Sequence, residues 1–541
     1  MPGGRQVAAL TSAGRGGERR LVLLLLLAFA VIAPARAEVA GLGQFGGGFD
    51  ELRRGIEALG TSGDARAGVI LDALQAGRLS TRSDGGPVIR GADDTVTDAE
   101  TGAPVRGATG LRPIRVNNQV RGALNAAQGG LRLFAPDPAT RAAAAEAVFK
   151  TRNAAALPAL DRALAAEAQA GVRTAMRQAR AAAMLANADA SEPDRLAAVA
   201  VLRERGDLDA RGILGSLPAP QSTAVTAAAG AAMAAIDWSL KLWGFAQGAF
   251  YGVSLGSVLL LAAAGLAITF GVMGVINMAH GEMVMIGAYT TFVVQGLLRD
   301  HAPGLVPLTL LFAVPAAFLV SGGLGVVVER GLIRFLYGRP LETLLATFGL
   351  SLVLQQAVRS IFGPTNREVS TPAWMSGSDQ VGQMTVTWNR VAIIVFAVAV
   401  LLALMAVLRF TALGLRMRAV TQNRQMAAAM GIRTPWIDAL TFGLGSGVAG
   451  MAGVALSQID NVSPNLGQGY IIDSFMVVVF GGVGNLWGTA VGALTLGVVN
   501  KFLEPVAGAV LGKIVVLVLL ILFIQRRPRG LFPLKGRAVE A

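Results

Sequence analysis

The chain lacks cysteine altogether and has only two histidines, His280 and His301, in 541 residues. The absence of cysteine excludes disulfides, thiolate catalysis and cysteine-ligated metal sites, and two histidines do not support a multi-histidine site. Charge is also scarce, because only 15% of the residues are charged whereas 53% are hydrophobic. Soluble domains rarely show this balance. We therefore expect a membrane protein with no metal and no catalytic residues.

A phosphate-binding loop of the form GxxxxGK[ST] is absent as well. Any nucleotide-driven work must then come from another polypeptide, and no cofactor is expected in this chain. The formal net charge of +13 could indicate a nucleic-acid partner. Much of the basic charge lies beside apolar spans, however, where the positive-inside rule explains it, so no nucleic acid is expected.

The first 37 residues have the pattern of an export signal. Arginines precede a short apolar run at residues 21–32, and Ala35-Arg36-Ala37 supplies a cleavage pattern before Glu38. An uncleaved first transmembrane helix is the alternative, but the run is short for a full span. Cleavage at this point predicts that the mature chain begins outside the cytoplasm.

Residues 38–235 differ in composition from the rest, being rich in Ala, Arg and Asp without a long apolar run. Residues 141–150, 157–168, 172–186 and 193–205 each place Ala, Leu and Val on one helical face. Residues 81–115 instead have a composition typical of a hairpin or loop. We expect a mainly α-helical, HEAT-like extracytoplasmic domain, which serves as a binding surface or as a spacer.

The hydropathy of residues 236–532 predicts an all-α polytopic membrane domain. Residues 533–541 are expected to form a cytoplasmic tail. About nine apolar stretches are expected at residues 248–271, 275–298, 306–328, 341–361, 390–410, 436–457, 470–485, 488–504 and 508–525. An odd count that starts outside ends inside, which agrees with the basic residues of the tail. The short segments at 470–504 are candidates for broken or re-entrant helices.

Three polar residues, Asn277, His280 and Glu282, lie inside one of these apolar stretches. Polar groups at membrane depth are costly unless they are paired or face water, so we interpret the three as a candidate translocation site. Each also has a structural alternative: Asn277 and His280 could join helices, and Glu282 could cap a broken helix. His280 and Glu282 are two residues apart and share a helix face only if the helix breaks at Gly281.

A glycine-rich stretch supplies further candidate residues for the pathway. Gly481, Gly482, Gly484 and Asn485 interrupt a short apolar segment. Close helix packing is the simplest explanation of the glycines, and an extended backbone facing the pore is the alternative.

The basic segment at residues 416–432 predicts a short amphipathic cytoplasmic helix that a glycine ends. Such a helix can dock in a groove on a partner, with apolar anchors and a basic rim, or it can lie on anionic lipid. The residues assigned to coupling with a separate ATPase are Arg418, Arg424, Met426, Ala427, Met430, Gly431 and Ile432.

These motifs resemble a known family. The sequence GVMGVINMAHGEMVMIGAY at residues 271–289 resembles the first signature of the branched-chain amino acid permease family of ABC importers. Residues 418–432 are similar to the docking segment of that family, and residues 480–485 resemble its later glycine-rich span. The resemblance covers residues 243–532. Within the family, the first motif and the long exported domain look most like the urea transporter permease subunit, whereas the ordinary amino acid permeases lack such a domain.

The resemblance implies a heteromeric importer in a bacterial inner membrane. This subunit would pair with a second permease, two cytoplasmic ATPases would bind the coupling segments, and a periplasmic solute-binding protein would deliver the solute. The N-terminal domain would be periplasmic, and the lipid bilayer would surround the spans.

The solute is the least determined part of this interpretation. Urea is neutral, whereas an amino acid route must manage a carboxylate and an ammonium group. No obvious pair of opposite charges stands in the spans, which favours a neutral solute. Branched-chain amino acids or short amides remain the alternative solutes. A membrane-anchored receptor or scaffold is the alternative function, although an anchor needs only one span, and an ATP-independent channel would leave the coupling segment unexplained.

Overall fold

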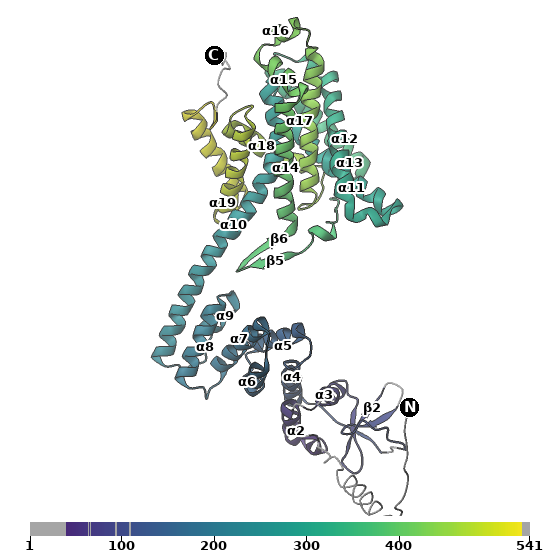
Figure 1. Cartoon of the computed structure of the whole chain (residues 1–541), viewed down its shortest axis with the longest axis vertical. Coiled ribbons are helices and arrows are strands. Elements are labelled where there is room, and N and C mark those ends of the chain that lie inside the picture. The colour runs from purple at the N-terminus through teal and green to yellow at the C-terminus, as the bar shows by residue number, and fades with distance from the viewer. Residues whose placement is uncertain are drawn as a thin grey trace, which may run out of the picture. The chain divides into compact units, whose positions relative to one another are not determined.

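The computed structural model describes residues 39, 41–62, 64, 66–91, 95–107 and 110–532. The predicted signal peptide and the predicted cytoplasmic tail lie outside these described residues. The chain divides into two compact units, Met1–Trp238 and Ser239–Ala541. The division falls inside the long helix α10 (Thr223–Met273) (Figure 1).

The first unit begins with a small mixed region. It contains η1 (Leu42–Gln44), α2 (Phe49–Ser62), α3 (Ala67–Gln75), β1 (Leu79–Thr81), β2 (Pro87–Arg90), β3 (Val96–Asp98), β4 (Arg112–Pro113) and α4 (Asn118–Arg132). The four strands form an antiparallel sheet in the order β3-β2-β1-β4. Sequence reasoning expected only a hairpin or loop here, because two- to four-residue strands are too short to show a clear alternation of apolar residues.

A helical region follows in the same unit. It contains α5 (Pro138–Thr151), η2 (Ala154–Ala156), α6 (Leu157–Ala166), α7 (Ala170–Ala186), α8 (Glu192–Arg205) and α9 (Leu208–Gly215). Side chains at the helix starts explain the boundaries, since Asp137, Ser191 and Asp207 each accept a backbone N–H of the first turn of α5, α8 and α9. Helices are therefore present at all four positions that the periodicity indicated. Their HEAT-like arrangement stays a prediction.

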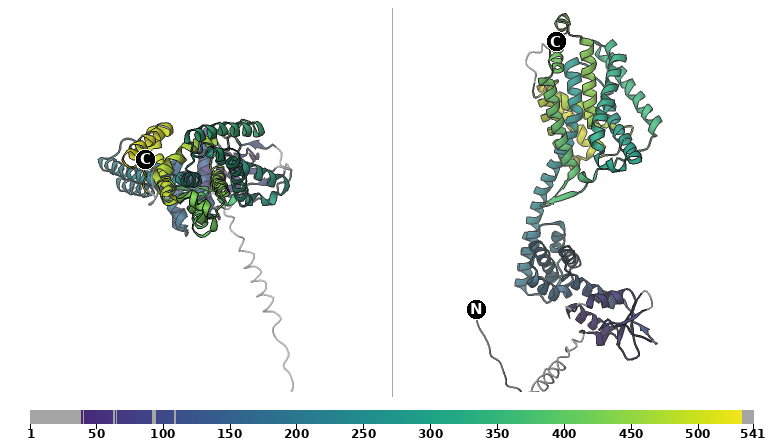
Figure 2. Two further views of the ribbon diagram at one scale, coloured as in Figure 1. Left: turned by 90° about the horizontal axis from the view of Figure 1, so that it is seen from above. Right: turned by 45° about the vertical axis from the view of Figure 1, so that its right-hand side comes forward.

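The second unit is a bundle of apolar helices, which Figure 2 shows from two further directions. Its elements are the end of α10, α11 (His280–His301), η3 (Pro303–Leu308), α12 (Thr309–Gly331), η4 (Ile333–Phe335), α13 (Pro340–Phe362), η5 (Ala373–Met375), β5 (Ser378–Val381), β6 (Met384–Thr387), α14 (Trp388–Phe410), α15 (Ala412–Gln422), α16 (Arg424–Ala429), α17 (Thr434–Leu456), α18 (Leu466–Gly481) and α19 (Leu486–Arg526). The β5–β6 hairpin lies at one end of this bundle, and α15 and α16 lie at the other (Figure 1).

Seven helices in the described part of the chain are long and apolar enough to cross a membrane. The sequence predicted about nine crossings. The stretch at 470–485 corresponds to α18, which has only 16 residues. The stretches at 488–504 and 508–525 both fall in α19, whose backbone leaves the helical conformation at Gly508. Several long apolar helices agree with the predicted polytopic class.

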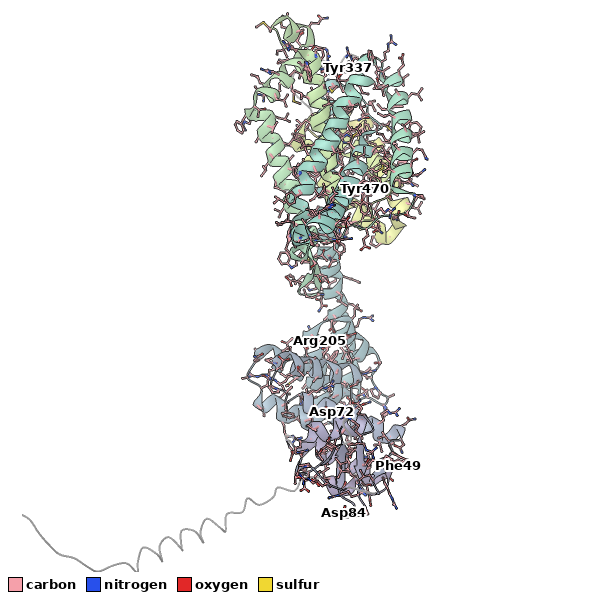
Figure 3. The ribbon with its side chains drawn as sticks, turned by 90° about the vertical axis from the view of Figure 1, so that its right-hand side faces the viewer. Phe49, Asp72, Asp84, Arg205, Tyr337 and Tyr470 are labelled. Atoms are coloured by element: carbon pink, nitrogen blue, oxygen red, sulfur yellow. The ribbon has the colours of Figure 1, made fainter. Side chains whose placement is uncertain are left out.

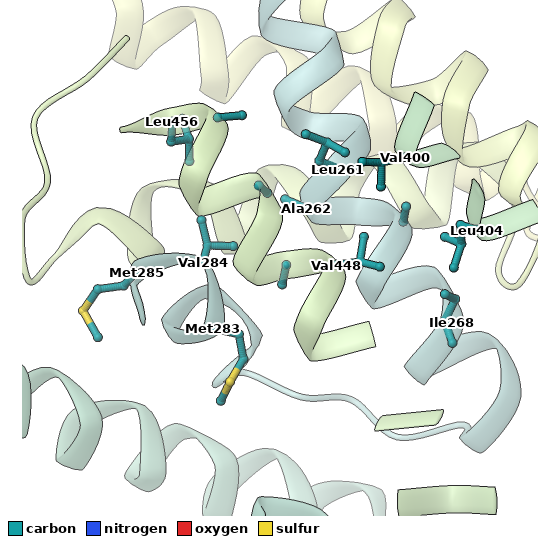
Figure 4. Close-up of a cluster of buried hydrophobic side chains, with 14 of the residues drawn as sticks. Leu261, Ala262, Ile268, Met283, Val284, Met285, Val400, Leu404, Val448 and Leu456 are labelled. Carbon is teal, nitrogen blue, oxygen red and sulfur yellow. The ribbon is translucent and has the colours of Figure 1, made fainter. Parts of the chain in front are cut away.

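The core of the second unit is formed mainly by α10, α11, α14 and α17. Leu261, Ile268, Met283, Val448 and Leu404 are among its buried side chains (Figure 4). Glycines let α17 approach its neighbours closely. A Cβ at Gly445 would lie 2.6 Å from the carbonyl oxygen of Gly265 in α10, for example. Small residues at such contacts are typical of helices that pack inside a membrane.

Candidate functional site

The polar residues of the first motif surround the start of α11. Helix α10 ends before Gly274, which has a positive φ of 68°, and residues 274–279 form no regular helix. The Asn277 side chain accepts a hydrogen bond from the Ala279 amide at 3.0 Å, and the Met278 amide donates to the Thr347 hydroxyl at 3.1 Å. Irregular backbone at membrane depth requires such partners. The helix break therefore lies before His280 and not at Gly281.

His280 and Glu282 point to different neighbours of α11. The His280 Nε2 atom lies 2.9 Å from the Ala262 carbonyl oxygen of α10. The Glu282 Oε1 atom accepts hydrogen bonds from the Ser351 hydroxyl at 2.9 Å and from the Gln355 amide at 2.8 Å, both in α13. Glu282 is only 1% exposed. The first turn of α11 is thus joined to two other helices by polar contacts.

Helix α13 contributes a polar stripe that sequence reasoning missed. Thr343, Thr347, Ser351 and Gln355 are spaced every four residues and are all buried. This spacing places them on one helix face. The other faces of α13 are apolar and exposed, for example at Leu345. The four-residue spacing of polar residues inside an apolar span was the signal that could have found them.

The start of α18 meets the start of α11. A Cβ at Gly281 would lie 2.5 Å from the Gly467 carbonyl oxygen, so the two backbones are in close contact. Gly281 is the second residue of α11 and Gly467 is the second residue of α18, and each glycine precedes a polar residue. These two polar residues are Glu282 and Gln468. The Gln355 side chain joins them, because its amide nitrogen donates to Glu282 and its amide oxygen accepts from Gln468 at 3.3 Å.

We call this arrangement the helix-start junction, and define it by Gly281, Glu282, Gln355, Gly467 and Gln468. Two helix N-termini that meet inside an apolar bundle concentrate backbone N–H groups and positive dipole ends at one place. Discontinuous helices of this kind form solute and ion sites in membrane transporters. The junction can therefore offer donors and acceptors to a polar solute at membrane depth.

Several buried polar atoms around the junction lack hydrogen-bond partners among the described residues. They are Asn277 Nδ2, His280 Nδ1 and Glu282 Oε2. Buried groups of this type are normally satisfied by protein, by ordered water or by a ligand. Their concentration within six positions of one motif marks this region as chemically unusual.

The glycine-rich candidates lie elsewhere, at the turn from α18 to α19. Gly481 and Gly488 face each other so closely that a Cβ on either would collide with the other's backbone. Gly482 has a positive φ of 107°. Asn485 accepts the amides of Trp487 and Gly488 at the start of α19, and its Nδ2 donates to the Phe532 carbonyl at 3.2 Å. These contacts fit the packing interpretation of Gly481, Gly482 and Gly484, and the structure does not bring them into the helix-start junction.

The coupling residues form an exposed end of the bundle. The expected single helix is interrupted, because the extended Asn423 ends α15 and its side chain caps α16 at the Met426 amide. Met426 is 60% exposed and Met430 is 78% exposed.

The other coupling residues differ in exposure. Ala427 is buried and Ile432 packs partly against the core. Arg418 is exposed, and Gly431 has a positive φ of 85°, as a glycine stop requires. We call Met426, Met430 and Trp436, which is 54% exposed, the apolar docking surface.

A buried polar cluster anchors this surface to the bundle. Arg424 of α16 forms an ion pair with Asp438 of α17, which is buried. Beside it the Tyr337 hydroxyl donates to Glu329 of α12 at 3.0 Å. Burial raises the pKa of Tyr337, so its phenol remains a neutral donor. Figure 3 labels Tyr337 near this end of the bundle. Arg424 also lies over the Tyr337 ring, so α16 is joined directly to α17 and, through Tyr337, to α12.

One sequence expectation is wrong at a specific place. The spans were thought to contain no pair of opposite charges, but Lys513 of α19 donates to Asp473 of α18 at 3.0 Å. The two residues are 40 positions apart, so only the tertiary fold brings them together. No group of acidic and histidine residues suited to a metal ion occurs within the described ranges.

Comparison with known proteins identifies the second unit. Residues 248–524 match a family model described as the permease component of a branched-chain amino acid transport system. The chain is 32% identical over 298 residues to the high-affinity branched-chain amino acid transport system permease protein BraD of Pseudomonas aeruginosa, covering 54% of this chain and 96% of that protein. It is 30% identical over 294 residues to the corresponding protein LivH of Escherichia coli, covering 53% and 95%. No solved structure matches the chain.

Proposed function

The chain belongs to the family of branched-chain amino acid transport permease components. We propose that it is the permease subunit of an ATP-driven importer and that the solute of this importer is urea. A permease of this family is a multi-pass transport subunit and not an enzyme. ATPase and solute-binding partners generally accompany such permeases. The solute, the number of partners and the roles of individual residues are the proposed part.

The helix-start junction supports a role in the passage of solute. It combines the buried Glu282 carboxylate, the buried Gln355 amide and the exposed Gln468 amide with the backbone N–H groups of two helix starts. Such groups are expensive at membrane depth and are kept there mainly for function. We assign Asn277, His280 and Glu282 to the pathway region, with Ser351, Gln355 and Gln468 as further members. The glycines of the α18–α19 turn position the helices around it.

The apolar docking surface supports a cytoplasmic partner. Its methionines are exposed and flexible, and arginines surround them, which suits insertion into a groove of another protein. We propose that a separate ATPase binds here. Two ATPases and a second permease would complete the importer, and Arg424 would transmit movement of the bound ATPase to α17 through Asp438.

The orientation follows from the charges near the docking surface. Basic residues cluster around α15 and α16 and just after Arg526, which favours a cytoplasmic location for these segments. We place the first unit in the periplasm of a bacterial inner-membrane protein on this basis. There it would help a solute-binding protein to deliver its cargo.

Urea is the proposed solute because the junction offers amide, hydroxyl and carboxylate groups suited to a small amide with a carbonyl and N–H donors. Branched-chain amino acids are the second candidate. Two observations favour them. The relatives BraD and LivH are permeases of branched-chain amino acid transport systems. The Asp473–Lys513 pair carries opposite charges that match those of a zwitterion.

Uptake of labelled urea by cells with and without the gene tests the proposal, with unlabelled leucine and short amides as competitors. We expect urea uptake to depend on the gene and to resist competition by leucine. Unchanged urea uptake together with lost leucine uptake would assign the chain to amino acid transport instead.

The docking assignment has a test of its own. Met430→Asp places a charge in the apolar docking surface and should abolish copurification of the ATPase. Leu208→Asp is the control, because Leu208 is an exposed apolar residue of the first unit. Normal copurification with Met430→Asp would remove the assignment.

The role of the first unit is tested by deletion of residues 38–235 with the signal kept. Assembly of the importer should persist while delivery of solute is impaired. An unchanged uptake rate would contradict the delivery role.

A further inference from the structure

The second half of α19 carries a single charge at membrane depth. Lys513 is the one charged residue between Glu504 and Arg526. It stands thirteen residues before Arg526, about 20 Å along a helix that rises 1.5 Å per residue. Its neighbours Val510, Leu511 and Ile514 are apolar and exposed. Lys513 thus lies far from the basic end of the helix.

The ammonium group of Lys513 is held at that depth. It donates to the Asp473 carboxylate at 3.0 Å and to the Gly469 carbonyl at 3.4 Å, both in α18. The Lys513 side chain is 52% exposed, whereas the Asp473 side chain is only 8% exposed. A lysine that faced lipid would extend toward the nearest interface. Lys513 instead bonds to Gly469 and Asp473 in the first half of α18, so its exposed half needs polar surroundings at the same level.

The surface of α18 beside this ion pair is also accessible. Gln468, Gly469 and Ile472 are exposed along one stripe of the helix. Gln468 belongs to the helix-start junction through its bond to Gln355. The exposed stripe therefore connects Lys513 with the buried polar groups around Glu282. Figure 3 labels Tyr470, which lies within this part of α18.

We propose that this surface, formed by Gln468, Gly469, Ile472, Asp473 and Lys513, faces the aqueous translocation route and contacts the solute. The inference rests on the proposed permease function and names a solute-facing surface within it. The surface presents ammonium donors, carboxylate and amide acceptors, and no net charge. It fits a small solute that is neutral or zwitterionic and that carries both donors and acceptors, and it disfavours ions of one sign.

The absence of cysteine allows a direct accessibility test on the full chain within the assembled importer. Gln468→Cys and Ile472→Cys each introduce a single thiol on the surface. Leu519→Cys and Leu522→Cys are matched controls, because both residues are exposed and lie on α19 away from the face of Lys513. The probe is a water-soluble, positively charged methanethiosulfonate, and the readout is the mass of the labelled chain.

Cysteines at 468 and 472 should react about tenfold faster than those at 519 and 522, because the reactive thiolate forms only where water reaches it. An excess of urea should slow the reaction at 468 and 472. Equally slow reaction at all four positions in the importer would overturn the proposal, and so would fast reaction at 519 and 522. The labelling rates measured without added solute do not depend on which solute is carried. If the protein does not carry urea, the uptake assay shows it. If the surface does not face water, the labelling assay shows it.

Discussion

The contact between the two helix starts gives the sharpest prediction. In Gly281→Ala the new Cβ would lie 2.5 Å from the Gly467 carbonyl oxygen and 3.2 Å from the Ile471 Cβ. Ordinary van der Waals contact begins near 3.4 Å, so α11 and α18 must move apart by nearly 1 Å. The obstructing atoms belong to backbone and cannot rotate away. The junction that holds Glu282 against Gln355 would then open.

Gly296→Ala is the matched control on the same helix, because nothing lies within 4 Å of a Cβ at that position. Both variants gain roughly 0.5–1 kcal/mol from the better helix propensity of alanine. Only Gly281→Ala also incurs overpacking, which costs about 1–3 kcal/mol. The two variants should therefore differ by the overpacking cost alone.

Thermal unfolding of the purified chains in detergent measures the difference, and urea uptake measures its effect. Gly281→Ala should unfold several degrees below Gly296→Ala and should transport poorly, whereas Gly296→Ala should match the unmodified chain or exceed its stability. Equal unfolding temperatures and equal uptake for the two variants would refute the close helix contact and the role of the junction.

Three further outcomes follow from named contacts. Asp438→Asn removes the partner of Arg424 and should cost about 1–2 kcal/mol, since Arg424 is half exposed; we expect normal copurification of the ATPase but less solute moved per ATP. Gln355→Leu should reduce uptake severalfold with little change in expression, which a rate assay at saturating solute would detect. In the first unit, the hydrogen bond from Arg141 holds the pKa of Glu167 below its ordinary value of 4.5. The stability that this carboxylate contributes is present above that value and is lost as the pH falls through the lower folded pKa. Hydrogen-exchange protection in α5 and α7, measured relative to the intrinsic exchange rate at each pH, should therefore decrease in acid, and Glu167→Gln should flatten this dependence.

Parts of this molecule could be predicted because their signals are local. The amphipathic spacing of residues in α5 to α8 predicts one buried face for each helix. The length of an apolar stretch is enough to predict a membrane span. The coupling segment was found from its arginines and its glycine stop, although the extended Asn423 that divides it has no strong sequence signature.

Other parts depend on the tertiary fold. No local sequence pattern indicates that the first residues of α18 contact the first residues of α11. Hydropathy locates an apolar segment in the sequence, but it does not give the depth in the membrane at which the helix begins. Asp473 and Lys513 belong to different helices. Each span considered alone contains only one of the two charges, so the pair could not be predicted from the sequence. Ser351 and Gln355 were within reach of sequence reasoning, since polar residues spaced by four in an apolar span predict one polar face.

The most direct test of the account is uptake by the complete importer reconstituted in liposomes, with ATP supplied on the cytoplasmic side and the solute-binding protein on the other. The account predicts that labelled urea accumulates only with ATP, that leucine does not compete, and that Met430→Asp abolishes accumulation. ATP-driven accumulation of leucine without urea would contradict the proposed solute, and urea flux that is independent of ATP would contradict the coupled mechanism.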